Sequence, residues 1–213
     1  MSEADATRKD PVPEPRWLAE ADDLAGFLFE RALPVRFSLA ATPEEREAAY
    51  RLRHRIVVAE GWRAAGDMPD GLERDEYDDE RAAQIVGWDG SRAVATARVV
   101  YPEPGRPLPT EAAFGIVVQP PGLVADAGRL IVAPEYRDPA HRVLGGLAAA
   151  IWTAMAGRGL RYAAVAMTGG IADLCRGLGF DVEVLGPGRE HWGAERFPAR
   201  LTVPDPRAWR PIR

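Results

Sequence analysis

The segment between residues 125 and 166 limits the possible folds more than any other part of the sequence. Its apolar pattern favours a strand over residues 125–132, a helix over 142–157 and a second strand over 162–166. A strand, a helix and a strand in this order pair in parallel around a right-handed crossover. The chain is therefore expected to be an α/β protein.

A hairpin is expected directly before this unit. Asp89-Gly90 separates two strand patterns, 83–88 and 93–101, and this dipeptide is a strong signal for a tight antiparallel turn. Further strands are expected at 35–39, 182–185 and 200–203, and further helices at 17–33, 42–61, 110–114 and 170–178. These elements predict a mixed, mostly antiparallel central sheet with helices on both faces.

Composition excludes several classes of protein. The net charge of −5 does not indicate nucleic-acid binding, and no apolar run reaches the roughly 20 residues that cross a bilayer. The single cysteine, Cys175, fits a reducing compartment, so the cytoplasm is expected. No metal-ligand spacing links it to the three histidines, and no metal site is expected. Residues 1–16 are interpreted as a disordered leader and 17–213 as a single domain.

Two arginines are expected at the edge of the core. Arg53 lies one step beside the apolar stripe of helix 42–61, which begins with a capping box at Thr42, and Arg98 shares a strand face with apolar residues. Buried arginines need carboxylates, and Asp75 and Asp78 precede the hairpin. Two interpretations stay open: a structural ion-pair network, or a site where arginine binds the carboxylate of an amino-acid-like ligand.

Three further positions are candidates for a ligand-binding or catalytic site. Trp62 either covers an apolar or cationic ligand or packs a loop onto the domain. Asp126 can act through water as the base for an attacking amine, or form a simple ion pair. Gly128 inside a strand indicates a bulge, which would turn backbone N–H groups toward a thioester oxygen.

The start of helix 142–157 is a candidate anion site. Arg142-Val143-Leu144-Gly145-Gly146 follows a strand, and a helix N-terminus offers unpaired N–H groups to a phosphate. An ordinary strand-to-helix turn is the alternative. This run resembles the pyrophosphate loop of GNAT-fold acyltransferases, and Leu174-Cys175-Arg176-Gly177-Leu178-Gly179-Phe180 looks like the closing junction of the same fold.

The charged positions resemble the signature of the acyl-homoserine-lactone synthases, the autoinducer synthases of quorum sensing. An arginine, a tryptophan, an E-x-D-x-x-D cluster, a strand arginine, and an acid three residues before an arginine follow in the family's order. The resemblance implies catalytic roles for Asp126 and Arg98 and donor binding by Arg142, Gly145 and Gly146. The substrate-binding positions that it implies are Arg53, Trp62, Asp75, Asp78, Arg129 and Thr168.

The resemblance further implies transfer of an acyl group from acyl carrier protein or coenzyme A to the amine of S-adenosylmethionine. Lactonisation would release methylthioadenosine and an acyl-homoserine lactone, with no permanently bound cofactor. A carrier-docking surface would be basic, and Arg137, Arg142, Arg158 and Arg161 are its candidates, although solvated arginines are the simpler interpretation.

Other functions stay open. Val57 stands where the family has an aromatic residue, and Asp126 where it usually has glutamate, so a long-chain N-acyl amino acid synthase is an alternative. A second alternative is an acetyl-coenzyme A N-acetyltransferase, although Ala164, Ala166 and Gly169 are expected to leave room for a longer chain. A third is a non-catalytic ligand-binding domain of the same fold.

Overall fold

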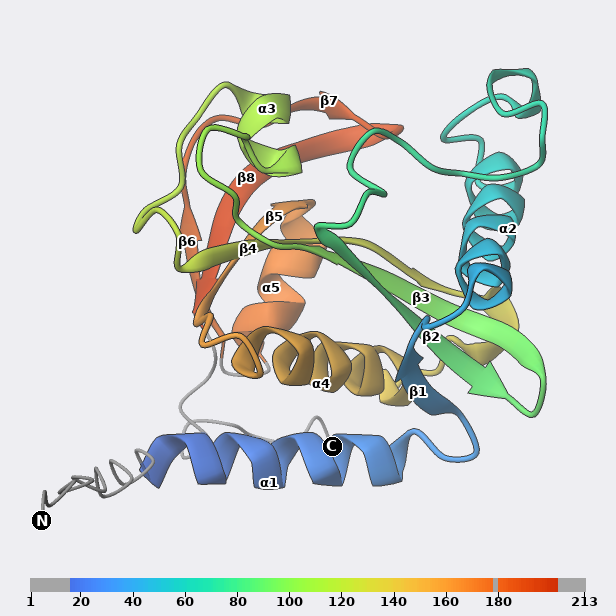
Figure 1. Ribbon diagram of the computed structural model, residues 1–213, viewed down its shortest axis with the longest axis horizontal. Coiled ribbons are helices and arrows are strands. Elements are labelled where there is room, and N and C mark those ends of the chain that lie inside the picture. Colours follow the sequence, from blue (N-terminus) through green and yellow to red (C-terminus); the bar gives the residue numbers. More distant parts are fainter. Residues whose placement is uncertain (1–15, 178–179, 203–213) are drawn as a thin grey trace, which may run out of the picture.

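The computed structural model describes residues 16–177 and 180–202, which form helices packed on both faces of one sheet (Figure 1). The helices are α1 (Arg16–Arg31), α2 (Pro43–Ala59), α3 (Pro109–Phe114), α4 (Arg142–Ala156) and α5 (Gly169–Gly177), with short 3-10 turns at Ala65–Asp67 and Pro134–Tyr136. The strands are β1 (Arg36–Leu39), β2 (Ala82–Asp89), β3 (Arg92–Val100), β4 (Val124–Val132), β5 (Tyr162–Met167), β6 (Asp181–Val184), β7 (Arg189–His191) and β8 (Ala194–Thr202).

The sheet is mixed and mostly antiparallel, as the sequence predicts. Its order is β1-β2-β3-β4-β5-β8-β6, with β7 paired to β8 outside this path. β4 and β5 form the parallel pair expected from the strand–helix–strand pattern. β2 and β3 form the hairpin expected at Asp89-Gly90.

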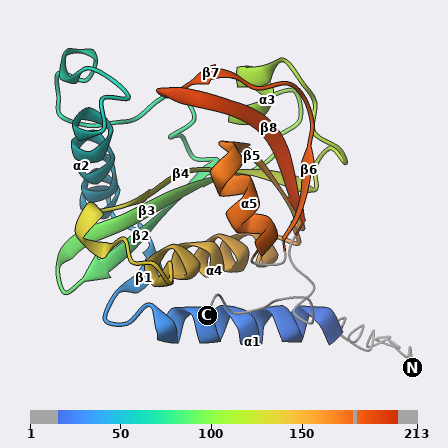
Figure 2. The same cartoon turned by 180° about the vertical axis from the view of Figure 1, so that it is seen from behind.

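Each face of the sheet is covered by its own helices. α2 begins with the predicted capping box, in which Thr42 Oγ1 accepts from Glu45 N–H and the Glu45 carboxylate accepts from Thr42 N–H. It packs on one face, while α4 packs on the other and α1 lies along the outer side of α4 (Figure 1). From behind, α5 lies across β5 and β8 (Figure 2). The main core therefore lies between α4 and strands β2 to β5.

The centre of the sheet opens between β4 and β5. These two strands pair only from Val124 to Asp126, opposite Tyr162 to Ala164, although both continue further. The register of β3 against β4 also slips just after Gly128: two steps on β3, from Arg98 to Thr96, match three on β4, from Gly128 to Ile131. The bulge predicted at Gly128 is confirmed, and Arg129 within it has a left-handed backbone (φ 54°).

The end of the sheet differs from the prediction. β8 begins at Ala194 rather than at residue 200, and β7 was not expected. β7 (Arg-Glu-His) is polar, and Pro198 inside β8 argues against a strand interior. Residues 1–15 of the expected leader, Leu178 and Gly179 of the expected junction, and Val203 lie outside the described residues, whereas Arg16 begins α1. Among the described helices, none has the length and apolar character to cross a membrane.

Candidate functional site

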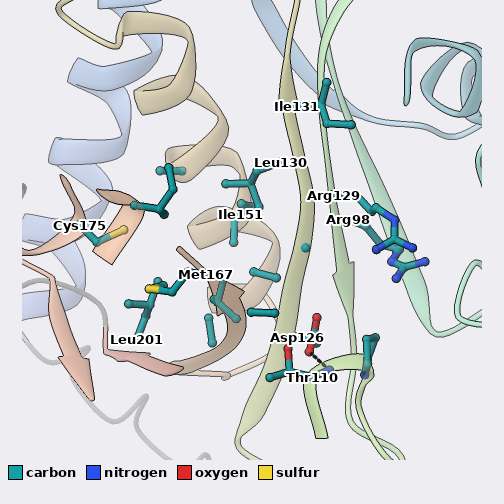
Figure 3. Close-up of a pocket in the computed structure, with 18 of the residues that line it drawn as sticks. Arg98, Thr110, Asp126, Arg129, Leu130, Ile131, Ile151, Met167, Cys175 and Leu201 are labelled. Atoms are coloured by element: carbon teal, nitrogen blue, oxygen red, sulfur yellow. Dashed lines mark hydrogen bonds between the residues drawn. The ribbon is translucent and has the colours of Figure 1, made fainter. Parts of the chain in front are cut away.

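A cavity of about 750 Å³ occupies the opening between β4 and β5. Residues of both strands line it, and its two ends differ in chemistry (Figure 3). Arg98 and Arg129 lie on one side of the β4 ribbon, whereas Leu130, Ile151, Met167 and Cys175 lie on the other. We call these the charged end and the apolar branch of the cavity.

Three arginines and three carboxylates form a closed ring at the charged end. Each carboxylate contacts two arginines, and each arginine contacts two carboxylates. In order around the ring the members are Arg53, Glu73, Arg129, Asp75, Arg98 and Asp78. The formal charges of the ring cancel, which is what permits this many ions to be buried together.

Arg53 occupies the most buried position of the ring. Its side chain is 0% exposed, and its Nε lies 2.8 Å from Glu73 Oε2, while Nη2 lies 3.0 Å from Asp78 Oδ2. Nη1 donates to Gln84 Oε1, and the guanidinium lies over the Tyr50 ring. Because every side of this guanidinium meets protein, Arg53 supports the ring and does not line the cavity.

Arg98 and Arg129 form the part of the ring that faces the cavity. Both contact Asp75, at 2.5 Å from Arg98 Nη1 to Oδ1 and 2.6 Å from Arg129 Nη2 to Oδ2. Arg98 pairs across the strands with Gly128, where the bulge in β4 begins. Burial alone would raise the pKa of Asp75, but hydrogen bonding and charge attraction from Arg98 and Arg129 lower it. Asp75 is therefore an anion at neutral pH.

Asp126 is a buried carboxylate outside the ring. It is 3% exposed, and its Oδ2 accepts a hydrogen bond from Thr110 N–H of α3 at 2.8 Å (Figure 3). Burial raises its pKa above the usual value for aspartate, partly offset by that hydrogen bond and by Arg98 and Arg129. A carboxylate held in this way beside a cavity is suited to proton transfer.

Two tryptophans line the cavity near Arg129 of the charged end. Trp62 and Trp192 both line the cavity, and Trp192 is at the tip of the β7–β8 hairpin. The Arg129 guanidinium lies 4.1 Å from the centre of the Trp192 ring. Gly193 has no side chain, and a Cβ there would come within 2.9 Å of Trp62. The hairpin tip is thus fitted against Trp62, across from β4.

The apolar branch runs from β5 along α4 and α5. It is lined by Leu130, Ala148, Ile151, Met155, Ala166, Met167, Ile171, Leu174, Cys175 and Leu201, among others. Thr168 also lines it, and its Oγ1 accepts from Ile171 N–H at the start of α5. Ala166 lines the branch as expected, but Ala164 does not: its side chain packs with Leu108 and Val118. Gly169 is exposed and also lies outside the lining.

The glycines at the start of α4 have a packing role. Both lie inside the helix, which begins at Arg142. A Cβ on Gly146 would come within 3.0 Å of Ala32 and still closer to the Phe37 ring, and one on Gly145 would meet Leu28 at 3.2 Å. Asp138 occupies the helix N-terminus, where its carboxylate accepts from Arg142 N–H. Arg142 itself is exposed, 3.5 Å from Asp138.

Several site residues were not predicted. Glu73 is 0% exposed and closes the ring, although the sequence shows it only as part of the acidic cluster. Nothing in the sequence placed Thr110, His191, Trp192 or Arg196 at the cavity, because they come from a six-residue helix and from the unexpected hairpin. Burial and the neighbouring arginines lower the pKa of His191, so this ring is neutral at neutral pH. Within residues 16–177 and 180–202, no cluster of side chains could hold a metal ion.

No protein-family model matches the sequence. Solved structures with the same fold include BjaI, a CoA-dependent acyl-homoserine lactone synthase, with SAM and isopentyl-CoA; the chain is 26% identical to it, over 79% of this chain and 82% of BjaI, at a TM-score of 0.62. MesI, another CoA-dependent acyl-homoserine lactone synthase, is 24% identical to this chain, over 79% of this chain and 89% of MesI, at a TM-score of 0.65. FeeM, an N-acyl amino acid synthase from uncultured soil microbes, is 17% identical to this chain, over 82% of this chain and 94% of FeeM, at a TM-score of 0.59.

The fold and the site together define an N-acyltransferase with the GNAT fold. The predicted fold class is confirmed. Within this class the chain resembles the acyl-homoserine lactone synthases, which confirms the resemblance seen in the charged positions of the sequence.

Proposed function

We propose that this chain transfers an acyl group from a coenzyme A thioester to the amine of S-adenosylmethionine and releases an acyl-homoserine lactone. One observation carries the proposal: a single cavity joins a buried carboxylate and a charged ring to a long apolar branch. An amino-acid-like acceptor fits the charged end and an acyl chain fits the apolar branch. BjaI, a similar structure, was determined with SAM and isopentyl-CoA, which supports both substrate classes.

The acceptor would bind at Arg98, Asp75 and Arg129. Arg98 is 1% exposed, lines the cavity, and its Nε has no hydrogen-bond partner among the described residues. A buried N–H without a partner costs free energy, which a carboxylate of the acceptor would recover. Trp62, which lines the cavity, would cover the sulfonium. Arg53 and Asp78 act from behind by holding Arg98 and Glu73 in place.

Asp126 is proposed as the base. The amine nitrogen attacks the thioester carbonyl carbon, Asp126 accepts the amine proton directly or through water, and the C–S bond breaks to release the thiolate. The bulge at Gly128 and Arg129 would present backbone N–H groups to the developing oxyanion. The acceptor carboxylate then attacks the γ-carbon of its own amino-acid part; the bond from that carbon to the sulfonium breaks, and its electron pair stays on the sulfur of the departing methylthioadenosine.

The donor is proposed to be coenzyme A rather than a carrier protein. A carrier needs a basic docking surface, but two of the four candidate arginines are already paired with acids: Arg137 with Glu60 at 2.9 Å and Arg142 with Asp138 at 3.5 Å. Donor binding by Arg142, Gly145 and Gly146 stays a prediction, because Asp138 already accepts from Arg142 N–H at this helix N-terminus and none of the three lines the cavity. Thr168 would contact the acyl chain.

The test is to incubate the pure protein with S-adenosylmethionine and a panel of acyl-CoA and acyl-carrier thioesters, and to measure product masses. Acyl-homoserine lactone and methylthioadenosine are the expected products, from coenzyme A donors in particular. Absence of methylthioadenosine with every donor would contradict the proposal. The cytoplasm, where both substrates are made, is the proposed compartment.

A long-chain N-acyl amino acid synthase is the second candidate. Val57, which is buried and lines the cavity beside Trp62, stands where the resembled family has an aromatic residue. The loss of that ring changes the acceptor side and leaves the acyl branch as it is. Adding free amino acids to the same panel distinguishes the two functions, because acylated amino acids would then form without methylthioadenosine.

A further inference from the structure

We infer that α1 forms the end wall of the apolar branch and sets the longest acyl chain that the enzyme accepts. The inference rests on the proposed function, since it concerns the acyl chain of the donor. It assigns a role in specificity to Leu24, Ala25 and Leu28, which the sequence placed only in a helix of unknown purpose.

The lining of the cavity shows how far the branch extends. Beyond β5 it follows the stripe Leu144, Ala148, Ile151 and Met155 along α4, where residues three and four apart share one face. It then reaches Ala149 and Trp152 on the flank of α4, and across from them Leu24, Ala25 and Leu28 of α1. Apolar side chains therefore line the branch from the sheet to the outermost helix layer.

The depth of the branch indicates a long chain. Packed helices have axes about 8–10 Å apart, so a branch that reaches α1 passes one full helix layer beyond the sheet. An acetyl group would leave most of this apolar surface without a ligand. The expected donor is therefore a long aliphatic acyl thioester.

α1 is held firmly enough to act as a wall. Ala25 is buried against Ala149 and Trp152, and Trp152 Nε1 donates to Asp22 Oδ1 at 3.4 Å. Leu28 lies against Gly145, where a Cβ would be only 3.2 Å away. The wall position therefore depends on side-chain contacts along the whole described part of the α1–α4 interface.

Leu24 is the position to test, because it lines the cavity but is only half-buried, so a larger side chain does not have to displace the helix. Leu24→Trp is expected to lower kcat/KM for dodecanoyl-CoA by about tenfold or more, since each methylene refused by an apolar pocket costs about tenfold. Activity with butanoyl-CoA should stay near that of the wild type. Leu24→Ala should shift the preference toward longer chains. Glu30→Trp, on the exposed side of α1, is the matched control and should change neither rate.

Binding of inert S-alkyl-CoA thioethers, measured by calorimetry, separates this inference from the proposed function. Loss of affinity for long alkyl chains only, in Leu24→Trp, supports the wall even if no lactone is ever formed. Equal binding of all chain lengths by the wild type, or an unchanged length preference in both Leu24 variants, would overturn it. If Leu24→Trp unfolds, the direction of the Leu24→Ala shift decides.

Discussion

At the scale of single residues, Asp126 is the side chain on which the proposed chemistry depends. Burial raises its pKa, so protonation removes the base at a pH where an exposed aspartate would still be ionised. The acid limb of the pH–rate profile should therefore follow Asp126. Asp126→Asn is expected to lower kcat by about 10²–10⁴-fold and to remove that limb, as measured by initial rates across pH.

The stability of the same variant provides its control. A carboxyl group with a raised folded-state pKa destabilises the fold as pH rises through that pKa, because the ionised form is disfavoured by burial. Asn cannot ionise and can still accept from Thr110 N–H. At neutral pH, urea unfolding should show Asp126→Asn at least as stable as the wild type; an unfolded variant would mean that the carboxylate is structural.

Replacing Arg53, unlike replacing Asp126, should lower the stability of the fold, because Arg53 supports the ring. Arg53→Ala leaves Glu73 and Asp78 as buried anions that lack one partner, at a cost of about 3–5 kcal/mol in unfolding free energy. Arg51, two positions earlier, is exposed and pairs with Glu47, so Arg51→Ala should be close to the wild type in the same urea titration. Equal losses of unfolding free energy in the two variants would contradict the supporting role of Arg53.

At the scale of elements, the two glycines at the start of α4 should differ in how much they contribute to helix packing. A Cβ on Gly146 would collide with Phe37 and Ala32, so Gly146→Ala should lose about 1–3 kcal/mol in unfolding free energy. At Gly145 the nearest atom is the flexible end of Leu28, so Gly145→Ala should be nearly neutral or gain up to about 1 kcal/mol from helix propensity. Thermal unfolding of the two variants measures these changes in unfolding free energy. Equal losses in both variants would contradict the packing explanation.

The β7–β8 hairpin is the element that completes the charged end. Its turn, Trp192-Gly193, has positive φ at both positions (55° and 69°), where asparagine is favoured and tryptophan is not. Trp192→Asn should therefore fold, with the better turn offsetting lost packing, but Arg129 loses its aromatic contact. The KM for the amine acceptor should rise about tenfold while the KM for acyl-CoA stays unchanged, because a cation–π contact is worth about 1–2 kcal/mol. A rise in the KM for acyl-CoA instead would place the hairpin on the donor side.

At the scale of the whole molecule, the sequence predicted the fold well where hydrophobic patterns are strong. The strand–helix–strand unit, the Asp89-Gly90 hairpin and the capping box at Thr42 all lie where they were expected. β7 was missed because its three residues are polar, and β8 was predicted only over residues 200–203 because Pro198 interrupts its pattern. β7 pairs with β8, and β8 pairs in turn with β5 and β6, and no local pattern encodes these pairings.

Part of the site was also predictable from the sequence. Charge balance alone paired Arg53 and Arg98 with Asp75 and Asp78. The closure of the ring by Glu73 and Arg129 was not predicted: the sequence indicated the bulge at Gly128, but not that Arg129 within it would contact Glu73 and Asp75. The extension of the acyl branch to α1 likewise depends on how two helices distant in sequence pack together.

The most direct test of the account is the stoichiometry of products from one reaction. With S-adenosylmethionine and a long-chain acyl-CoA, the wild type should release free coenzyme A, methylthioadenosine and acyl-homoserine lactone in equal amounts, and Asp126→Asn should release almost none. With free amino acids also present, coenzyme A released with an acylated amino acid but without methylthioadenosine would contradict S-adenosylmethionine as the acceptor. Full activity in Asp126→Asn would contradict the proposed base.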